Sequence, residues 1–384
     1  MQIQKLLAFS VAEYEGRMQR ARQEMTRRGL DVLLVHTPEN ICYLSGYQTP
    51  GYYMYQVLVL PLVEPPLLIT RLIEQTNVFG FSWFENSVAY VDGQDPLELT
   101  AESLRKRKLD TQRIGLETGC WFLTVNQAER LRTLLPRATW VDAAGTVEGA
   151  RAVKSPAEIA HLRQAAKIAS LGMRAGVDRI EVGASERRVA GAIHEAMIGA
   201  GGEHMGMPPF VSAGERTMLV HHTSYSAEPF RRGDVVFIEL SACVWRYTAA
   251  LLRCAFVGPV DAEIERRAHV SLDALDAAIE AVRPGATSGD VHDAWHRTVV
   301  KGGYQINKRA GYSLGLTFAP DWGEGYLLDL AKGDPTVLVP GMVFHIPSSI
   351  RMPGRQSVGV SETVLVTAGG CEVLTDLDRR FFAR

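Results

Sequence analysis

The sequence predicts an α+β protein of two domains, a smaller α/β domain over residues 1–150 and a larger domain over residues 151–384. Strand-like and helix-like stretches alternate up to about residue 145, which is typical of an α/β domain. A strong helix start then follows at Ser155. Beyond it, helical stretches come first and strands come later, which favours an antiparallel sheet covered on one face by helices. The length of 384 residues also fits two domains.

In the first domain, Ser10 and Glu13 form a capping box ahead of an amphipathic helix that ends at Gly29. The segment 37–40 reads as a loop, and the aromatic run GYQTPGYYMYQ follows it. Short apolar runs predict strands at 31–36, 57–62, 67–70, 113–117 and 139–142, with a helix at 125–134.

In the second domain, Ser155, Pro156 and Glu158 supply an N-cap, an N1 proline and a capping-box acid, so a helix begins there. Periodic apolar residues predict three further helices, at 185–199, 262–282 and 288–302. A central hairpin is expected at 233–253, and later strands in 341–350 and 357–370.

Composition narrows the class of partner. The 41 basic and 43 acidic residues leave a net charge of −2 without a basic stripe, so we expect no nucleic-acid partner. No run approaches the roughly 18 apolar residues of a membrane span, so we expect no membrane partner either. The five cysteines are scattered and form no C-x-x-C pair, which is typical of reduced thiols in the cytoplasm.

A single carboxylate, Glu239, lies within the apolar run 235–240. Burying a carboxylate is costly unless a partner compensates its charge. Two interpretations stay open: a bystander that faces water or pairs with an arginine, and a functional carboxylate held in a dry cleft. Glu362, on the apolar run VSETVLV, presents the same choice.

Histidines offer three candidate sites. His221 and His222 precede the Glu239 strand in a polar segment, where a histidine near a carboxylate suits acid–base catalysis. His345 lies in an apolar run, which is more typical of a core histidine. His292 and His296 have the spacing of zinc-binding helices, but an amphipathic helix face is the favoured interpretation.

Four segments, taken in order, resemble the pita-bread family of creatinases, prolidases, and Xaa-Pro and methionine aminopeptidases. They are RAVKSPAEIAHLRQAAKIA, FVSAGERTMLVHHTSYSAEPFRRGDVVFIEL, GMVFHIPSSI and SVGVSETVLVTAGGCEVLT. The resemblance implies a creatinase-type N-terminal domain followed by a pita-bread catalytic domain. It also implies a homodimer in which the N-terminal domain contributes to the neighbouring active site.

The metallopeptidases of this family bind two divalent ions through two Asp, one His and two Glu. By resemblance, those five positions are occupied here by Glu239, Ala250, Tyr312, Pro347 and Ser361. Four of these residues are poor ligands for such ions. We therefore expect no metal cofactor. The chain resembles the metal-independent branch of the family, and ectoine hydrolase in particular, through the segments PFRRGDVVFIEL, GLTFAPDWGE and SETVLV.

The resemblance implies hydrolysis of a C–N bond in a small amidine-type substrate, such as an ectoine-like cyclic amidine or a creatine-like guanidino compound. Glu239 would attack the amidine carbon or activate water, and His222 would shuttle the proton. A carboxylate on the substrate would need an arginine, with Arg351 and Arg355 as candidates. The expected substrate-binding residues are Tyr52, Tyr55, Tyr247, Tyr312, Asp321, Trp322, His345 and Glu362.

Two other functions remain open. One is a metal-dependent Xaa-Pro-type aminopeptidase or dipeptidase with an unusual ligand set, which could use His292 and His296. The other is a catalytically silent relative that binds a small ligand, which would show stabilisation by that ligand without product.

Overall fold

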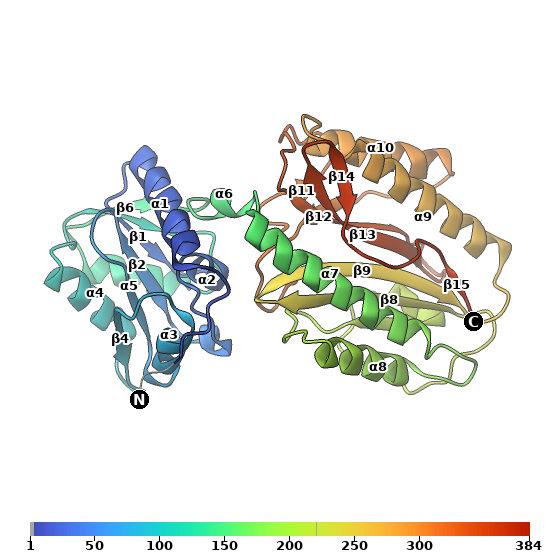
Figure 1. The fold of residues 1–384 in the computed structure, drawn as a ribbon, viewed down its shortest axis with the longest axis horizontal. Coiled ribbons are helices and arrows are strands. Elements are labelled where there is room, and N and C mark those ends of the chain that lie inside the picture. The colour runs from blue at the N-terminus through green and yellow to red at the C-terminus, as the bar shows by residue number, and fades with distance from the viewer. Residues whose placement is uncertain (1–3, 220) are drawn as a thin grey trace. The chain divides into compact units, whose positions relative to one another are not determined.

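The computed structural model describes residues 4–219 and 221–384. The chain folds into two compact units, Met1–Arg151 and Ala152–Arg384. Figure 1 shows an α/β unit and a second unit in which long antiparallel strands lie beside four long helices. The prediction of an α+β protein, with an α/β domain followed by a larger domain of antiparallel strands and helices, is confirmed.

The first unit is built on a six-stranded mixed sheet in the order β4-β3-β2-β1-β5-β6. Neighbours β1–β2 and β2–β3 are antiparallel, and the remaining neighbours are parallel. The strands are β1 (Val32–Val35), β2 (Val57–Pro61), β3 (Leu67–Arg71), β4 (Ser87–Tyr90), β5 (Arg113–Leu116) and β6 (Thr139–Asp142). The helices are α1 (Val11–Arg28), α2 (Pro38–Ser45), α3 (Gln75–Phe81), α4 (Pro96–Lys106), α5 (Val125–Leu134) and α6 (Glu148–Arg151), with 3-10 turns η1 (Pro50–Tyr53) and η2 (Leu72–Glu74).

Local signals explain most of this unit. Ser10 caps α1 through the Glu13 amide, and Gly29 ends the helix in the left-handed conformation at φ 66°. The prediction of a loop at 37–40 is wrong, because Pro38 occupies the first turn of α2 and every residue of that helix is buried. Sequence analysis also missed α3, α4 and β4.

The second unit contains two sheets. One is four-stranded in the order β15-β9-β8-β7, and the other is five-stranded in the order β11-β10-β12-β13-β14. The strands are β7 (Phe210–Ala213), β8 (Val235–Val244), β9 (Tyr247–Phe256), β10 (Gly311–Ser313), β11 (Asp329–Leu330), β12 (Val343–Ile350), β13 (Val358–Thr367), β14 (Gly370–Val373) and β15 (Phe382–Ala383). The helices are α7 (Pro156–Val177), α8 (Glu186–Gly199), α9 (Ala262–Ala281) and α10 (Ser288–Lys301), with the 3-10 turn η3 (Gly214–Met218).

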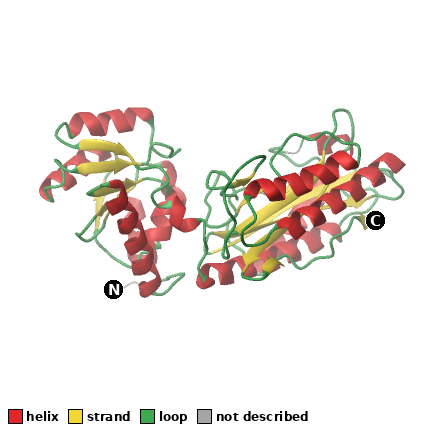
Figure 2. Ribbon diagram, turned by 90° about the horizontal axis from the view of Figure 1, so that it is seen from above, coloured by secondary structure: helices red, strands yellow, loops and turns green. Residues whose placement is uncertain are grey.

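The two sheets meet along β9 and β13. The Leu252 amide donates to Ser361 Oγ at 2.7 Å, and the Ala250 amide donates to Thr363 Oγ1 at 3.0 Å. Helix α7 packs on β8 and β9, while α9 packs on β12 and β13. Figure 2 shows the helices of this unit lying over its strands. One face of the joined sheets is therefore left for a site.

The β8–β9 hairpin turns through Trp245 and Arg246, which both have positive φ, 49° and 65°. Such a turn matches the right-handed twist of paired strands, although glycine or asparagine is the usual occupant. Glu203 stabilises it by accepting hydrogen bonds from both backbone amides, at 2.8 and 3.1 Å. The hairpin fixes the register that places Glu239 opposite Leu252.

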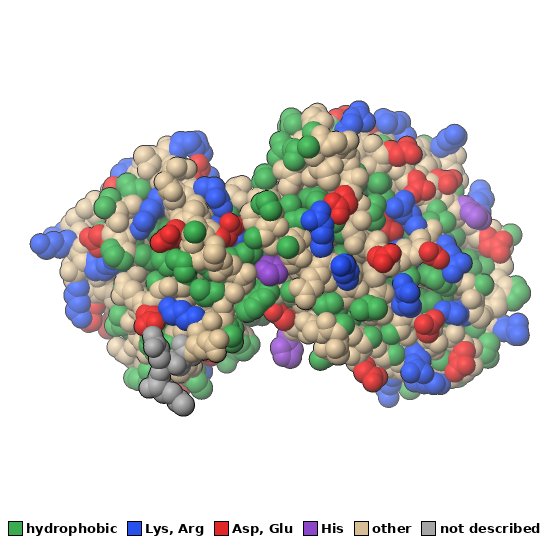
Figure 3. All heavy atoms as spheres, viewed as in Figure 1, with side chains coloured by type: hydrophobic (Ala, Val, Ile, Leu, Met, Phe, Trp, Pro, Cys, Tyr) green, Lys and Arg blue, Asp and Glu red, His purple; other side chains and the backbone are tan. Residues whose placement is uncertain are grey.

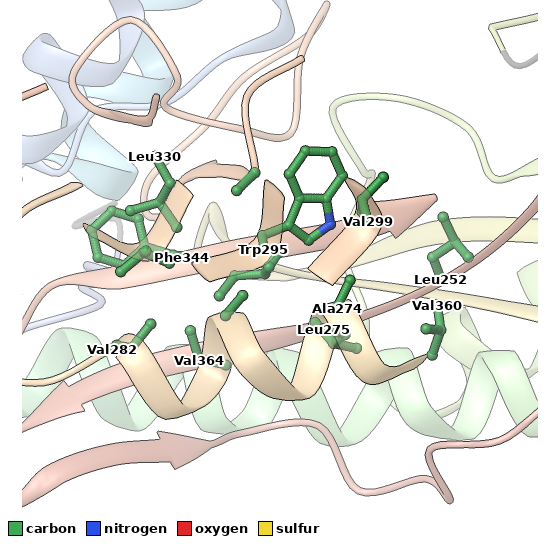
Figure 4. Close-up of a cluster of buried hydrophobic side chains, with 14 of the residues drawn as sticks. Leu252, Ala274, Leu275, Val282, Trp295, Val299, Leu330, Phe344, Val360 and Val364 are labelled. Carbon is green, nitrogen blue, oxygen red and sulfur yellow. The ribbon is translucent and has the colours of Figure 1, made fainter. Parts of the chain in front are cut away.

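The core of the second unit lies between α9, α10 and the strands of the five-stranded sheet. Figure 4 shows Trp295 among Leu275, Val299, Leu330 and Phe344, all fully buried. Trp295 Nε1 donates to Ser348 Oγ at 3.0 Å, so its polar atom is satisfied. This cluster anchors β12 and β13 from the side of α9 and α10.

Charges of both signs are mixed over the face of the molecule shown in Figure 3. No helix among the described residues is long and apolar enough to span a membrane.

Candidate active site

Glu239 is the buried carboxylate of the second unit. It lies in the middle of β8, opposite Phe210 on β7 and Leu252 on β9, and its residue is only 4 % exposed. Within the described residues no hydrogen bond or ion pair compensates it. Burial raises the pKa of Glu239, whereas the cations Arg351 and Lys308 act in the opposite direction. The bystander interpretation, which needs solvent or a salt bridge, does not fit this environment.

Two cations lie near Glu239. Arg351 follows the end of β12, packs its guanidinium 5.6 Å from the centre of the Phe237 ring, and has a buried Nε without a partner. Lys308 donates its ammonium to the Pro347 carbonyl. Burial and the repulsion from Arg351 lower the pKa of Lys308 to about 7, although Glu239 favours its charged form. Lys308 belongs to no recognisable motif, so sequence reasoning missed it.

A hydrogen-bonded chain of side chains runs beside Glu239. Trp322 Nε1 donates to the Tyr312 hydroxyl at 2.7 Å, and that hydroxyl lies 2.8 Å from His345 Nδ1. His345 Nε2 lies 2.6 Å from Ser361 Oγ, which accepts the Leu252 amide. Tyr312, His345 and Trp322, all predicted site residues, are therefore brought together.

The strand register explains this convergence. Tyr312 pairs with His345, and Pro347 pairs with Ser361, so all four side chains project from one face of the sheet. Gly323 lets the Trp322 segment approach, since a Cβ there would lie 2.6 Å from the Tyr312 ring.

His345 is a wholly buried member of this chain rather than a substrate contact. Its ring is 0 % exposed, and both ring nitrogens have partners. Burial, with Lys308 and Arg309 nearby, lowers the pKa of His345 to about 3, so the imidazole is neutral at pH 7. The prediction that His345 binds substrate is corrected: its side chain hydrogen-bonds to Tyr312 and is itself out of reach of solvent.

The two adjacent histidines face different surroundings. His221 stacks on Phe210 at 5.0 Å, and the charges that act on it belong to Arg351, Asp321 and Arg309. Phe210 lies opposite Glu239 in the strand register, and Arg351 is one of the cations near Glu239. His221, which stacks on Phe210 and is acted on by the charge of Arg351, therefore faces the site.

His222 instead meets Phe210 and Tyr225 edge-on, and the charges that act on it belong to Glu186 and Arg216. Burial lowers the pKa of both histidines. The charged groups of the site therefore act on His221, whereas those that act on His222, the predicted proton shuttle, lie elsewhere.

Glu362 does not face the site. Its carboxylate forms an ion pair with Arg253 at 2.6 Å, a second with Arg379 at 3.3 Å, and accepts the Thr375 hydroxyl. Consecutive residues of a strand point to opposite faces, so Glu362 points away from the face that Ser361 occupies. The predicted contact of Glu362 with substrate does not fit this orientation.

Tyr247 is committed to packing. It is fully buried, its hydroxyl donates to Glu158 Oε1 at 2.8 Å, and its ring stacks on His161 at 5.9 Å. These contacts attach β9 to α7. The structure gives Tyr247 a structural role in place of the predicted substrate contact.

In the first unit, Tyr55 belongs to the core. It is 6 % exposed, and its hydroxyl lies 3.1 Å from Thr100 Oγ1. Its predicted contact with substrate is therefore not supported by its position. Tyr52 is partly exposed and meets Phe122 edge-on at 5.4 Å.

The other candidates divide similarly. Asp321 is exposed, and its Oδ1 accepts the amides of Trp322 and Gly323, so it shapes the turn that carries Trp322. Of the two candidate arginines, Arg355 interacts with Arg267, whereas Arg351 interacts with Glu239. His292 is buried, and its ring stacks on that of His296.

The five positions that would hold two divalent ions do not fit them. Glu239 is the one carboxylate among them, and the other four are Ala250, Tyr312, Pro347 and Ser361. The described residues contain no group of three or more His, Cys, Asp or Glu side chains that could hold a metal. Tyr312 and Ser361 instead bond to His345, so neutral hydrogen-bonding groups occupy these positions.

Two family models match the chain. Residues 17–153 match the creatinase/prolidase N-terminal domain, and residues 160–368 match metallopeptidase family M24. Together they cover both units.

Individual relatives agree. The chain is 30 % identical to the ectoine hydrolase of Halomonas elongata over 406 residues, covering 100 % of both chains. It is 27 % identical to the Xaa-Pro dipeptidase of Lactobacillus helveticus over 357 residues, covering 91 % of this chain and 94 % of that protein. The solved Xaa-Pro dipeptidase from Bacillus anthracis shares the fold, with a TM-score of 0.84 at 21 % identity, over 97 % of this chain and 100 % of the other. The chain therefore belongs to metallopeptidase family M24, the pita-bread hydrolase family of creatinases and Xaa-Pro peptidases.

Proposed function

We propose that this protein is a metal-independent hydrolase of a C–N bond in a small amidine-type substrate, such as an ectoine-like cyclic amidine or a creatine-like guanidino compound. The similarity to ectoine hydrolase along the whole chain supports this substrate class. The alternative, a metal-dependent Xaa-Pro-type peptidase, has support in the dipeptidase relatives.

The observation that carries the proposal is the state of Glu239. It is a buried carboxylate to which no described residue donates a hydrogen bond, and it lies among positions whose side chains are poor metal ligands. Burial strengthens it as a base because it raises its pKa, while the charges of Arg351 and Lys308 act in the opposite direction and favour the carboxylate. A carboxylate in this state can act directly on a carbon centre.

The reaction begins at the amidine carbon. In one route Glu239 attacks this carbon and the electron pair of the C=N bond moves to nitrogen; water later adds to the same carbon, and the C–O bond to Glu239 breaks to release its carboxylate. In the other route Glu239 takes a proton from water as the water oxygen adds to carbon. In both, the tetrahedral carbon expels one nitrogen as an amine and retains the other in an amide or urea.

His221 is placed to supply the proton that the leaving nitrogen needs. Its lowered pKa keeps it neutral at pH 7, so it can accept a proton from water and return it to nitrogen. Such a group typically contributes about 10²–10⁴-fold to the rate.

Two properties of the whole protein are part of this proposal. Following the resemblance, the protein forms a homodimer in which Tyr52 of one copy contributes to the site of the other. Its five free cysteines suit a reducing cytoplasm.

The test is a mass-spectrometric screen of the protein after chelation and dialysis. Ectoine, creatine, other cyclic amidines and Xaa-Pro dipeptides are incubated with the native chain and with Glu239→Gln. We expect hydrolysis of an amidine by the chelated native chain and a loss of at least about 10³-fold in Glu239→Gln, because no other carboxylate shares its position.

The screen separates the alternatives. Cleavage of a Xaa-Pro dipeptide that requires an added divalent ion would establish the peptidase in place of the proposed function. Thermal stabilisation by a compound that is never converted would identify a ligand-binding relative. Normal turnover by Glu239→Gln would remove Glu239 from the mechanism.

A further inference from the structure

The direction of each hydrogen bond in the chain beside Glu239 follows from counting donors, beginning at Ser361. Its side chain is fully buried, and its oxygen already accepts the Leu252 amide at 2.7 Å. Within the described residues, the other partner of this oxygen is His345 Nε2 at 2.6 Å. A buried hydroxyl proton must find an acceptor, so the Ser361 proton points at Nε2.

This assignment fixes the tautomer of His345. A neutral imidazole has one N–H donor and one acceptor nitrogen. Since Nε2 accepts from Ser361, Nδ1 carries the proton. Nδ1 lies 2.8 Å from the Tyr312 hydroxyl, so it donates to that oxygen.

Tyr312 then has only one use for its own proton. Its oxygen accepts from His345 Nδ1 and also from Trp322 Nε1 at 2.7 Å. Neither partner can accept in return, so the Tyr312 O–H must point to a third group. Glu239 and Asp321 are the carboxylates whose charges act on Tyr312, and Asp321 Oδ1 is engaged by backbone amides. Leu252, which lies opposite Glu239 in the strand register, donates its amide to Ser361 of the same chain, so this chain runs along the Glu239 side of the sheet and the free proton is available where a substrate meets that carboxylate.

We propose that Tyr312 is a catalytic hydrogen-bond donor, aimed into the site by Ser361 and His345, that stabilises the heteroatom gaining a lone pair at the reacting carbon. This inference rests on the proposed function. As oxygen adds to an amidinium carbon, the electron pair of the C=N bond moves to nitrogen, which then accepts the hydrogen bond. Tyr312 keeps its proton throughout.

The arrangement favours the transition state over the bound substrate. An amidinium nitrogen has no lone pair to accept a hydrogen bond, whereas the nitrogen of the tetrahedral state has one. The bond to Tyr312 thus forms as the reaction proceeds, and such an interaction raises kcat. Burial raises the pKa of the Tyr312 hydroxyl well above its usual range, so the proton stays on its oxygen, and the Arg309 guanidinium 4.4 Å from the centre of the ring acts in the opposite direction. Aligned hydrogen bonds also polarise one another. By resemblance, Tyr312 occupies the position of a metal ligand in the family's metallopeptidases. Its hydrogen bond would polarise the reacting group as a metal ion does in those enzymes.

The first test is independent of turnover. NMR of protein labelled with ¹³C,¹⁵N-histidine, with His345 assigned by its loss in His345→Gln, reports which ring nitrogen carries the proton at pH 7. We expect Nδ1–H in the native chain and loss of this preference in Ser361→Ala. A proton on Nε2, or an imidazolium, overturns the direction of the chain and the proposal with it.

The second test measures kcat and KM on the substrate found in the screen. We expect Tyr312→Phe to lower kcat by about 10²–10³-fold with little change in KM, as for the loss of one oxyanion donor. Ser361→Ala should lower kcat less, and Ser361→Thr, which keeps the hydroxyl, should restore it. Thr363→Val is the matched control, because it removes a buried hydroxyl from the same face, and that hydroxyl bonds to the Ala250 backbone rather than to His345. Native kcat in Tyr312→Phe, or an equal loss in Thr363→Val, contradicts the proposal.

Failure of the proposed function remains distinguishable. If Glu239→Gln retains turnover while Tyr312→Phe loses it, the role of Glu239 is wrong and that of Tyr312 stands. If the tautomer is Nε2–H while Glu239→Gln is inactive, the proposed function stands and the donor role of Tyr312 falls.

Discussion

Glu239 and His221 form the candidate acid–base pair, and Phe210 connects them. Phe210 lies opposite Glu239 in the strand register and stacks on His221 at 5.0 Å. His222, the next residue, turns toward Glu186 and Arg216. Both histidines have lowered pKa values, so their protonation states do not distinguish them. The surroundings that their side chains face do.

We therefore expect His221→Ala to lower kcat by about 10²–10⁴-fold, because it removes the proton carrier at the reacting centre. His222→Ala should stay within about tenfold of native kcat, since its ring packs among Phe210 and Tyr225 instead. Steady-state kinetics on the same substrate compare the two variants, and thermal melts check that both are folded. The reverse order of effects would return the shuttle to His222.

Strand β13 presents two different chemistries on its two faces. Ser361 joins the chain that leads to Tyr312, while Glu362 pairs with Arg253 on the opposite face. Both members of that ion pair are almost fully buried, with side chains 0 % and 2 % exposed. The pair connects β9 and β13, the strands along which the two sheets meet.

Arg253→Met should therefore destabilise the fold by about 3–5 kcal/mol, since it leaves the Glu362 carboxylate buried without its main partner. The double variant Arg253→Met/Glu362→Met should recover much of this loss, because no buried charge is left uncompensated. Urea unfolding curves measure both. Glu362→Gln should keep a near-native KM, and a large rise in KM with normal stability would restore Glu362 to the substrate site.

The two units bear different parts of the proposed mechanism. The acid–base groups, the cations and the hydrogen-bonded chain all belong to the second unit, Ala152–Arg384. The first unit contributes Tyr52 only through the proposed dimer. A test of that proposal has to separate action within one chain from action between chains.

Mixing two inactive variants makes this separation. Glu239→Gln and Tyr52→Ala should each be weak as homodimers, and an equal mixture after subunit exchange should regain about a quarter of native activity, because half of the dimers then hold one intact site. Light scattering should give twice the 42.3 kDa chain mass. Absence of recovery in proven mixed dimers would place Tyr52 outside the partner's site.

Much of this protein could be predicted from short-range signals. The capping box of Ser155 and Glu158 starts α7, and helical periodicity marks α9 and α10 within a residue or two of their observed ends. Order and motif along the chain were sufficient for the pita-bread class. Helix α2 escaped prediction because its buried position, not its propensity, makes it helical.

The sequence by itself determined the fold and the family and singled out Glu239 as a candidate, because caps, periodicity and ordered motifs are local properties of the chain. Only the tertiary structure decided which neighbours face that carboxylate. Adjacent residues on a strand point to opposite faces, so Ser361 and Glu362, which are consecutive in β13, have different surroundings. In the polar segment before β8, both histidines contact Phe210, and the different charged groups around the two rings separate His221 from His222. Lys308 carries no local signal at all, because long-range packing alone places its ammonium beside Pro347 and within reach of Glu239.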